Sequence, residues 1–85
     1  MKNENAENPL VKASSVIEAP KWRHVPDILE ISALNHNCKL DMHVQKRLLR
    51  ETIFFTFEGK EIDIESLISD LNFILETNIK ILKKY

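Results

Sequence analysis

Apolar residues recur at helical spacing through the last third of the chain. From Ile64 onward they follow one another in steps of three and four, and Ile74 and Ile81 widen the stripe. Such a stripe is typical of an amphipathic α-helix, and Asp63 is a suitable N-cap for it. The positions expected in a core or dimer seam are Ile64, Leu67, Ile68, Leu71, Leu75, Asn78 and Leu82.

A second long helix is predicted from about Asp41 to Phe57, with Gly59 as its C′ residue. At 100° per residue its apolar positions form two stripes on nearly opposite sides, one of Val44, Leu48, Thr52 and Phe55, the other of Met42, Leu49, Ile53 and Phe57. A helix that is apolar on two sides is buried on two sides. In so short a chain we expect the second side to meet another subunit, with Val44, Leu48 and Phe55 in the core or the seam.

The same region has an alternative interpretation as a β-hairpin. Residues Thr52–Phe57 are β-branched or aromatic, and Glu58–Lys60 could turn the chain into a strand over Glu61–Ile64. The helix is preferred because Asp41–Arg50 carries helical periodicity and no helix breaker precedes Gly59.

Residues 1–24 are predicted to form a flexible or extended tail, because they are mostly polar and Pro9 and Pro20 interrupt any helix. A short helix is expected from Pro26–Asp27 to about Asn35. The expected fold is therefore all-α: over residues 25–85, a small hairpin of two long helices plus the short N-terminal helix, which forms a dimer.

The composition of the chain excludes several kinds of functional site. The 85-residue chain has a formal charge of -1, one cysteine and one glycine. An internal disulfide and a glycine-rich phosphate loop are excluded, and bulk attraction to nucleic acid is not expected. We find no apolar run typical of a signal peptide or membrane span, so a cytoplasmic protein without a membrane partner is expected. A core this small favours self-association, and a homodimer is the predicted form.

The residues with metal-ligand chemistry cluster once, at His36, Cys38, Asp41 and His43. Their spacing matches no zinc motif, and a second cysteine is missing. A Cys–His nucleophile pair has no better support. The sequence therefore predicts no metal, no cofactor and no enzymatic activity.

Three features are candidates for partner binding. Phe73 falls on the polar side of the last helix, where it is either an interface anchor or an ordinary exposed aromatic. Trp22 either packs on the helices or is a motif for a partner. Lys46, Arg47 and Arg50 share one flank of the second predicted helix and either meet phosphate or an acidic partner, or form a solvated face.

Asn78 falls inside the apolar stripe of the last predicted helix, where it either fixes the register of helix packing or lies in water.

The C-terminal part of the chain resembles a known family. The residues that carry the resemblance are Gly59, Ile62–Asp63, Leu67–Ile68, Leu71, Leu75–Glu76–Thr77 and Ile81–Leu82–Lys83. They are similar, without gaps from about Leu48 to Lys83, to the YmgB (AriR) proteins of enteric bacteria, which are small biofilm and acid-resistance regulators also called two-component connector proteins. The resemblance implies an all-helical dimer similar to the Hha nucleoid-associated proteins. It also implies action through a regulatory partner, with DNA association for some members.

The expected function is that of a non-enzymatic regulator that dimerises and binds a signalling or transcriptional regulator, such as a response regulator. One alternative is a DNA-associated repressor or antitoxin that uses Lys46, Arg47 and Arg50. DNA binding is otherwise expected to be weak and electrostatic, and tight binding with sequence preference would favour this alternative. A second alternative is a phage- or plasmid-encoded inhibitor of a host protein, which would share these features.

Overall fold

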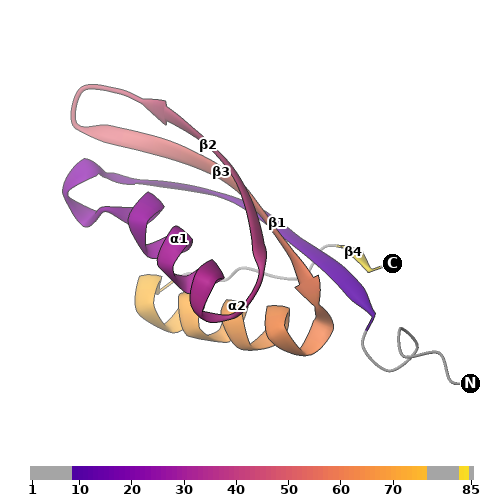
Figure 1. The fold of residues 1–85 in the computed structure, drawn as a ribbon. Helices are drawn as coiled ribbons and strands as arrows, with labels where there is room; N and C mark the ends of the chain where they lie inside the picture. The colour runs from indigo at the N-terminus through magenta and orange to yellow at the C-terminus, as the bar shows by residue number, and fades with distance from the viewer. Residues whose placement is uncertain (1–8, 77–82, 85) are drawn as a thin grey trace, which may run out of the picture.

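The fold is a two-layer arrangement of strands and helices (Figure 1), seen in a computed structural model that describes residues 9–76, 83 and 84. In chain order the elements are β1 (Leu10–Pro20), the 3₁₀ helix η2 (Lys21–Arg23), α1 (Val25–Asn35), β2 (Lys39–Lys46), β3 (Arg50–Lys60), α2 (Glu61–Leu75) and β4 (Lys83–Lys84). The expected all-α class is wrong: the protein is a mixed α/β fold.

The strands form one antiparallel sheet in the order β2-β3-β1-β4. Because β1 and β2 both run antiparallel to β3, they are parallel to each other, and α1 connects them across the sheet. The third strand therefore lies between two parallel strands joined by a helix. This is the split β-α-β arrangement of ferredoxin-like sandwiches.

Side chains alternate strictly along β3, and this alternation separates the two faces of the sheet. Ile53, Phe55 and Phe57 are buried on the side of the helices, whereas Phe54 is 41% exposed on the other side. Period-two alternation of this kind is characteristic of a sheet covered on one face. In the described residues both helices lie on the same face, and the opposite face is open (Figure 1).

One hydrophobic core fills the space between the sheet and the helices. The sheet contributes small residues from β1 and large ones from β3, and each helix contributes one apolar stripe. Its buried apolar members are Val11, Ala13, Ala19, Val25, Leu29, Ala33, Ile53, Phe55, Phe57, Ile64, Leu67, Ile68, Leu71 and Leu75. Alanines in β1 leave room for the helices to approach the sheet closely.

The helix predicted over Asp41–Phe57 is wrong, because this segment is the β2–β3 hairpin. The apolar residues that formed two opposite stripes are alternate residues of two strands. When alternate residues are plotted at 100° per residue, they fall on both sides of a helix. Of the predicted core positions in the hairpin, Phe55 is buried and Val44 is half-buried against the core, but Leu48 is 87% exposed at the turn. The hairpin alternative identified strand character in Thr52–Phe57, but its turn and second strand are also wrong, since the turn precedes β3.

Two further expectations fail for related reasons. Leu10–Pro20, placed in the tail, is a strand in which Pro20 takes the last position, where a proline is tolerated. Gly59 is not a helix C′ residue; it lies in β3 opposite Val11, and a Cβ there would be 3.1 Å from the Cys38 sulfur. The glycine therefore makes room for the thiol rather than ending a helix.

The remaining helical expectations correspond to real elements with different bounds. The short helix after Val25 is present as α1, and the last helix as α2, which begins at Glu61, before the proposed cap Asp63, and ends at Leu75. The predicted core residues Ile64, Leu67, Ile68, Leu71 and Leu75 are buried. Asn78 and Leu82 lie outside the described residues. Neither α1 nor α2 has the length and apolar character that a membrane crossing requires.

Two phenylalanines of β3 that point to opposite faces of the sheet test the alternation directly. Phe57 is fully buried, so Phe57→Ala should lower the free energy of unfolding by about 3–5 kcal/mol. Phe54→Ala, on the open face, should cost clearly less, because much of its ring already contacts water. Urea unfolding followed by circular dichroism measures both changes, and equal costs would contradict the assignment of the two faces.

Candidate interaction surface

One end of the molecule is built from the β2–β3 turn and η2, which are distant in sequence. The turn is closed by the Arg47 N–H, which donates to the Arg50 carbonyl oxygen at 2.8 Å. The Lys21 N–H donates to the Leu49 carbonyl oxygen at 3.0 Å and attaches η2 to the turn. His24, with φ of 55°, then redirects the chain into α1. Two backbone hydrogen bonds therefore fix this end, which we call the tip.

Three large apolar side chains are exposed at the tip. The exposed fractions are 74% for Trp22, 87% for Leu48 and 75% for Leu49. Together with Pro20, Lys21 and Arg50 they line a shallow hollow. Exposed apolar side chains that gather in one place, unlike single ones, are typical of interaction sites.

Basic residues surround these apolar side chains. Lys46, Arg47 and Arg50 come from the hairpin, and Lys21 from η2. Four acidic residues lie nearby. Glu18 has its carboxylate 3.6 Å from Arg50, and Glu51, the cross-strand neighbour of Lys46, is only 6% exposed. Asp27 and Glu30 of α1 are exposed and line a hollow together with Lys21 and Lys46. The tip therefore has basic side chains next to its apolar ones, with acidic side chains of α1 on one side.

The structure brings together four of the five predicted partner-binding residues. Trp22, Lys46, Arg47 and Arg50 all lie at the tip, although the prediction placed them on a tail and a helix. Phe73 lies apart from them on α2, outside the tip hollow, and is 86% exposed. Sequence reasoning missed Leu48 and Leu49 as surface residues. The signal that could have found them is the strand-like alternation on both sides of Arg47–Arg50.

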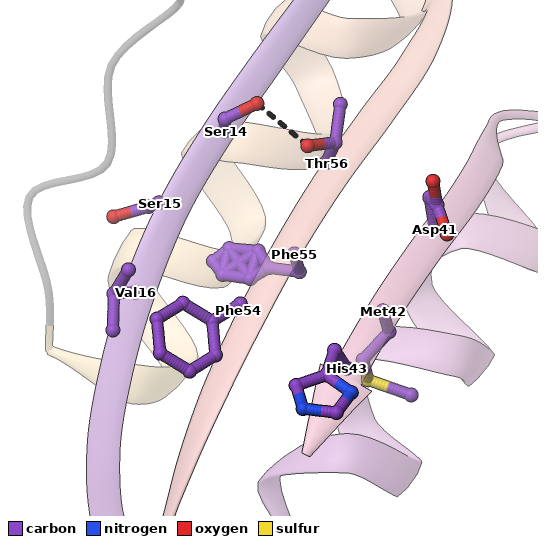
Figure 2. Close-up of a pocket in the computed structure, with 9 residues that line it drawn as sticks. All are labelled: Ser14, Ser15, Val16, Asp41, Met42, His43, Phe54, Phe55 and Thr56. Carbon is purple, nitrogen blue, oxygen red and sulfur yellow. Dashed lines mark hydrogen bonds between the residues drawn. The ribbon is translucent and has the colours of Figure 1, made fainter. Parts of the chain in front are cut away.

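The open face of the sheet carries a second shallow hollow, with mixed chemistry (Figure 2). Phe54 lies between its cross-strand neighbours Val16 and His43, and the His43 and Phe54 ring centroids are 6.1 Å apart. One row along, the Ser14 and Thr56 hydroxyl oxygens are hydrogen-bonded at 2.7 Å. The hollow itself is lined by one acidic residue, Asp41, and one histidine, His43, so no single class of charged ligand is favoured there.

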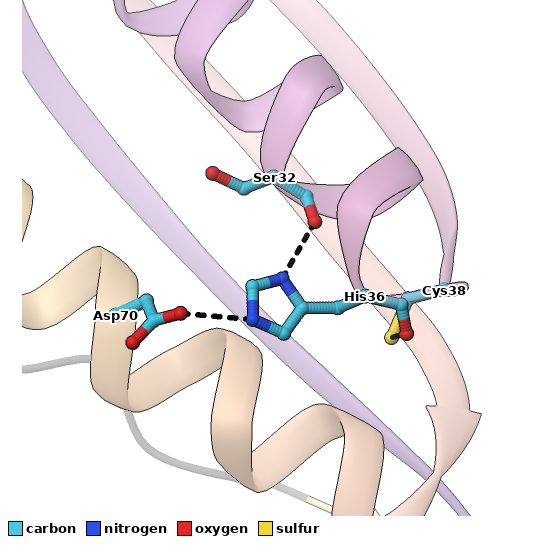
Figure 3. Close-up of polar contacts among 4 residues, drawn as sticks. All are labelled: Ser32, His36, Cys38 and Asp70. Atoms are coloured by element: carbon cyan, nitrogen blue, oxygen red, sulfur yellow. Dashed lines mark hydrogen bonds and ion pairs between the residues drawn. The ribbon is translucent and has the colours of Figure 1, made fainter.

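His36 connects the two helices (Figure 3). Its Nδ1 is 2.9 Å from the Ser32 carbonyl oxygen, and its Nε2 is 2.9 Å from Asp70 Oδ2. Both ring nitrogens thus face acceptors, and a protonated ring donates both hydrogen bonds, whereas a neutral one donates a single bond. This arrangement has the character of a structural link between α1 and α2.

The four residues considered as metal ligands do not converge. His36 points toward α2, whereas Asp41 and His43 line the hollow on the open face of the sheet (Figures 2 and 3). Within residues 9–76 and 83–84, no group of three or more histidine, cysteine, aspartate or glutamate side chains could hold a metal ion. Cys38 is half-buried, and its thiol donates to the His36 carbonyl oxygen at 3.4 Å.

The Cys38 thiol provides a chemical test of this region. Burial, and to a lesser extent the Asp63 carboxylate, raise the pKa of Cys38. Because the thiolate is the reactive form, iodoacetamide should modify Cys38 more slowly at pH 8 than it modifies glutathione. Asp63→Asn should increase the rate, since it removes a negative charge that disfavours the thiolate. The exposed Glu65→Gln is the matched control, and an equal effect of both substitutions would contradict the assignment.

Comparison with known proteins does not assign this chain to a family. The chain matches no protein-family model, and no curated protein matches it at a significant level. Membership of the YmgB family stays a prediction. The all-helical architecture that it implies is not the fold of this chain, because residues 48–75 of the segment of resemblance are divided between the hairpin and α2.

Proposed function

We propose that this chain is a non-enzymatic, cytoplasmic regulatory protein that binds an acidic surface of a signalling or transcriptional regulator through its tip. The observation that carries the proposal is the pair of exposed leucines in the hairpin turn. Neither leucine has a positive φ, so the backbone of this turn accepts most residue types and does not itself require leucine. The exposure of these two side chains to water has a cost that contact with a partner would remove.

The composition of the tip supports a protein partner. Tryptophan and arginine are enriched among the residues that dominate binding energy at protein interfaces, and Trp22, Arg47 and Arg50 are of these types. Trp22 supplies a large rigid surface, and Leu48 and Leu49 extend it. The basic residues around them complement an acidic rim, which increases the association rate and orients the partner.

The resemblance to connector proteins supports the same class of function, because those proteins also act through a regulatory partner. The inhibitor of a host protein, expected as an alternative, would use the same surface. The identity of the captured partner would distinguish a regulator of the connector type from an inhibitor of a host protein.

DNA association is a second candidate, and one observation favours it. The sequence shows Lys46, Arg47 and Arg50 without an aromatic neighbour, whereas Trp22 lines the same hollow as Lys21 and Arg50. Basic residues interleaved with an aromatic ring are suited to nucleic acid backbones and bases. The protein partner remains preferred because Leu48 and Leu49 are 87% and 75% exposed and contribute no charge that would attract phosphate.

The proposal predicts that partner capture depends on the leucines of the tip. Leu48→Ser/Leu49→Ser should reduce the amount of partner recovered by tagged protein at least tenfold, because serine suits the turn but offers no apolar contact. The melting temperature should stay nearly unchanged, since both side chains are exposed. Quantitative mass spectrometry of the eluates gives the recovery. Phe73→Ala is the matched control, an exposed apolar residue away from the tip.

Two outcomes would contradict the proposal. One is unchanged recovery with the double variant; the other is a loss with Phe73→Ala alone, which would move the binding face to α2. A separate titration with a DNA duplex at several salt concentrations tests the alternative. Tight binding that falls steeply with salt, and that Lys46→Gln/Arg47→Gln/Arg50→Gln abolishes, would replace the protein partner with DNA.

A further inference from the structure

Among residues 9–76, 83 and 84, β2 is the terminal strand of the sheet, and no described strand lies beside the N–H and C=O groups of its outer edge. The side chains of this strand are also incompletely covered. Leu40, Met42 and Val44 point toward the helices, yet all three are only half-buried. An exposed edge with apolar side chains is a template for a further strand unless it is protected.

A hollow between α1 and this edge marks the incomplete cover. Leu40 and Met42 line it from β2, and Leu34 lines it from α1. Leu34 is 81% exposed, although it lies beside these half-buried apolar side chains. An added strand that brought its own apolar residues to this side would cover the group.

The sequence of β2 is complementary to itself when two copies run antiparallel with Met42 opposite Met42. In this register Leu40 lies opposite the partner's Val44 on the helix side. On the open side, Asp41 lies opposite the partner's His43. Each of these pairings occurs twice by symmetry. Apolar pairs and acid–base pairs directly opposite one another stabilise antiparallel strands.

Other registers lose this match. A shift of one residue in the pairing brings apolar side chains opposite polar ones from the other face. The next register that preserves the faces puts His43 opposite His43 and Leu40 opposite Lys46. The register in the other direction puts Asp41 opposite Asp41 and Lys39 opposite His43. The Met42-centred register instead leaves Lys39 opposite Gln45, so that neither lysine at the strand ends meets a cation.

We infer that two copies of this chain associate through their β2 edges, with Met42 on the two-fold axis, to form one continuous antiparallel sheet. Such an interface is isologous, because the same residues contribute from both subunits. The homodimer expected from the sequence would therefore be held together by paired strands and not by the helical seam that the sequence predicted. This inference does not rest on the tip, which lies at the hairpin turn rather than along the edge.

A cysteine placed on the axis tests the dimer and its register. In a Cys38→Ser background, Met42→Cys should give a disulfide-linked dimer under mild oxidation. Residues directly opposite in antiparallel strands have Cα atoms about 4.5–5.5 Å apart, which a disulfide spans. Asp41→Cys alone and His43→Cys alone should not cross-link, whereas a mixture of the two should give the mixed dimer.

Sedimentation equilibrium supplies the independent measurement on the unmodified chain. Wild type should have twice the mass of one chain at micromolar concentration. Met42→Lys should have the mass of one chain, because it places two like charges opposite each other on the axis. Its circular dichroism spectrum should be unchanged, because Met42 is only partly buried and the long lysine side chain can extend to water. Leu48→Lys, an exposed apolar residue at the turn, is the control and should remain dimeric.

Three results would overturn the inference. The first is a monomeric wild type up to 100 μM concentration. The second is a Met42→Lys variant that is folded and still dimeric. The third is a cross-link with Asp41→Cys or His43→Cys alone at least as efficient as with Met42→Cys, which would place another residue on the axis. If Met42→Lys does not fold, the cross-linking series and the mass of the wild type decide whether the dimer forms through β2.

Discussion

The packing of one face of β3 against both helices is the interaction on which the rest of the structure depends. This strand pairs with β1 on one side and β2 on the other, so it holds the sheet together as well as the core. Its buried side chains, Ile53, Phe55 and Phe57, meet the apolar stripes of α1 and α2. Because the core lies on this face, the side chains of Leu48 and Leu49 and those of the open face lie outside it and are available for contacts.

Part of this fold follows from the sequence and part does not. The amphipathic stripe of α2 is unambiguous, because a long 3.6-residue period has few alternatives. The hairpin is not, because alternate apolar residues in strands can also be fitted to a helix with two apolar sides. A helix apolar on both sides in so small a chain should itself have suggested strands. β1 was hidden by its composition, since a strand buried on one face against helices can use alanine and serine at positions where no bulk is needed.

The candidate site shows a similar division. Residue types alone identified Trp22 and the basic residues, because tryptophan in a polar segment and clustered arginines are unusual wherever they fall. Their convergence could not be foreseen, since it depends on the hydrogen bond between Lys21 and Leu49 across the fold. The exposure of Leu48 could not be foreseen either, because it follows from the position of a turn that the helical interpretation removed.

The alternation along β3 also limits how this protein can diverge. Inserting or deleting one residue within the strand would move the following phenylalanines to the open face and bring threonine and glutamate into the core. The turn at Leu48–Leu49 carries no such restriction, because residues added there leave both strand registers intact. Changes of length should therefore accumulate at the end of the molecule, and homologues would differ most in size and reach where the tip meets its surroundings.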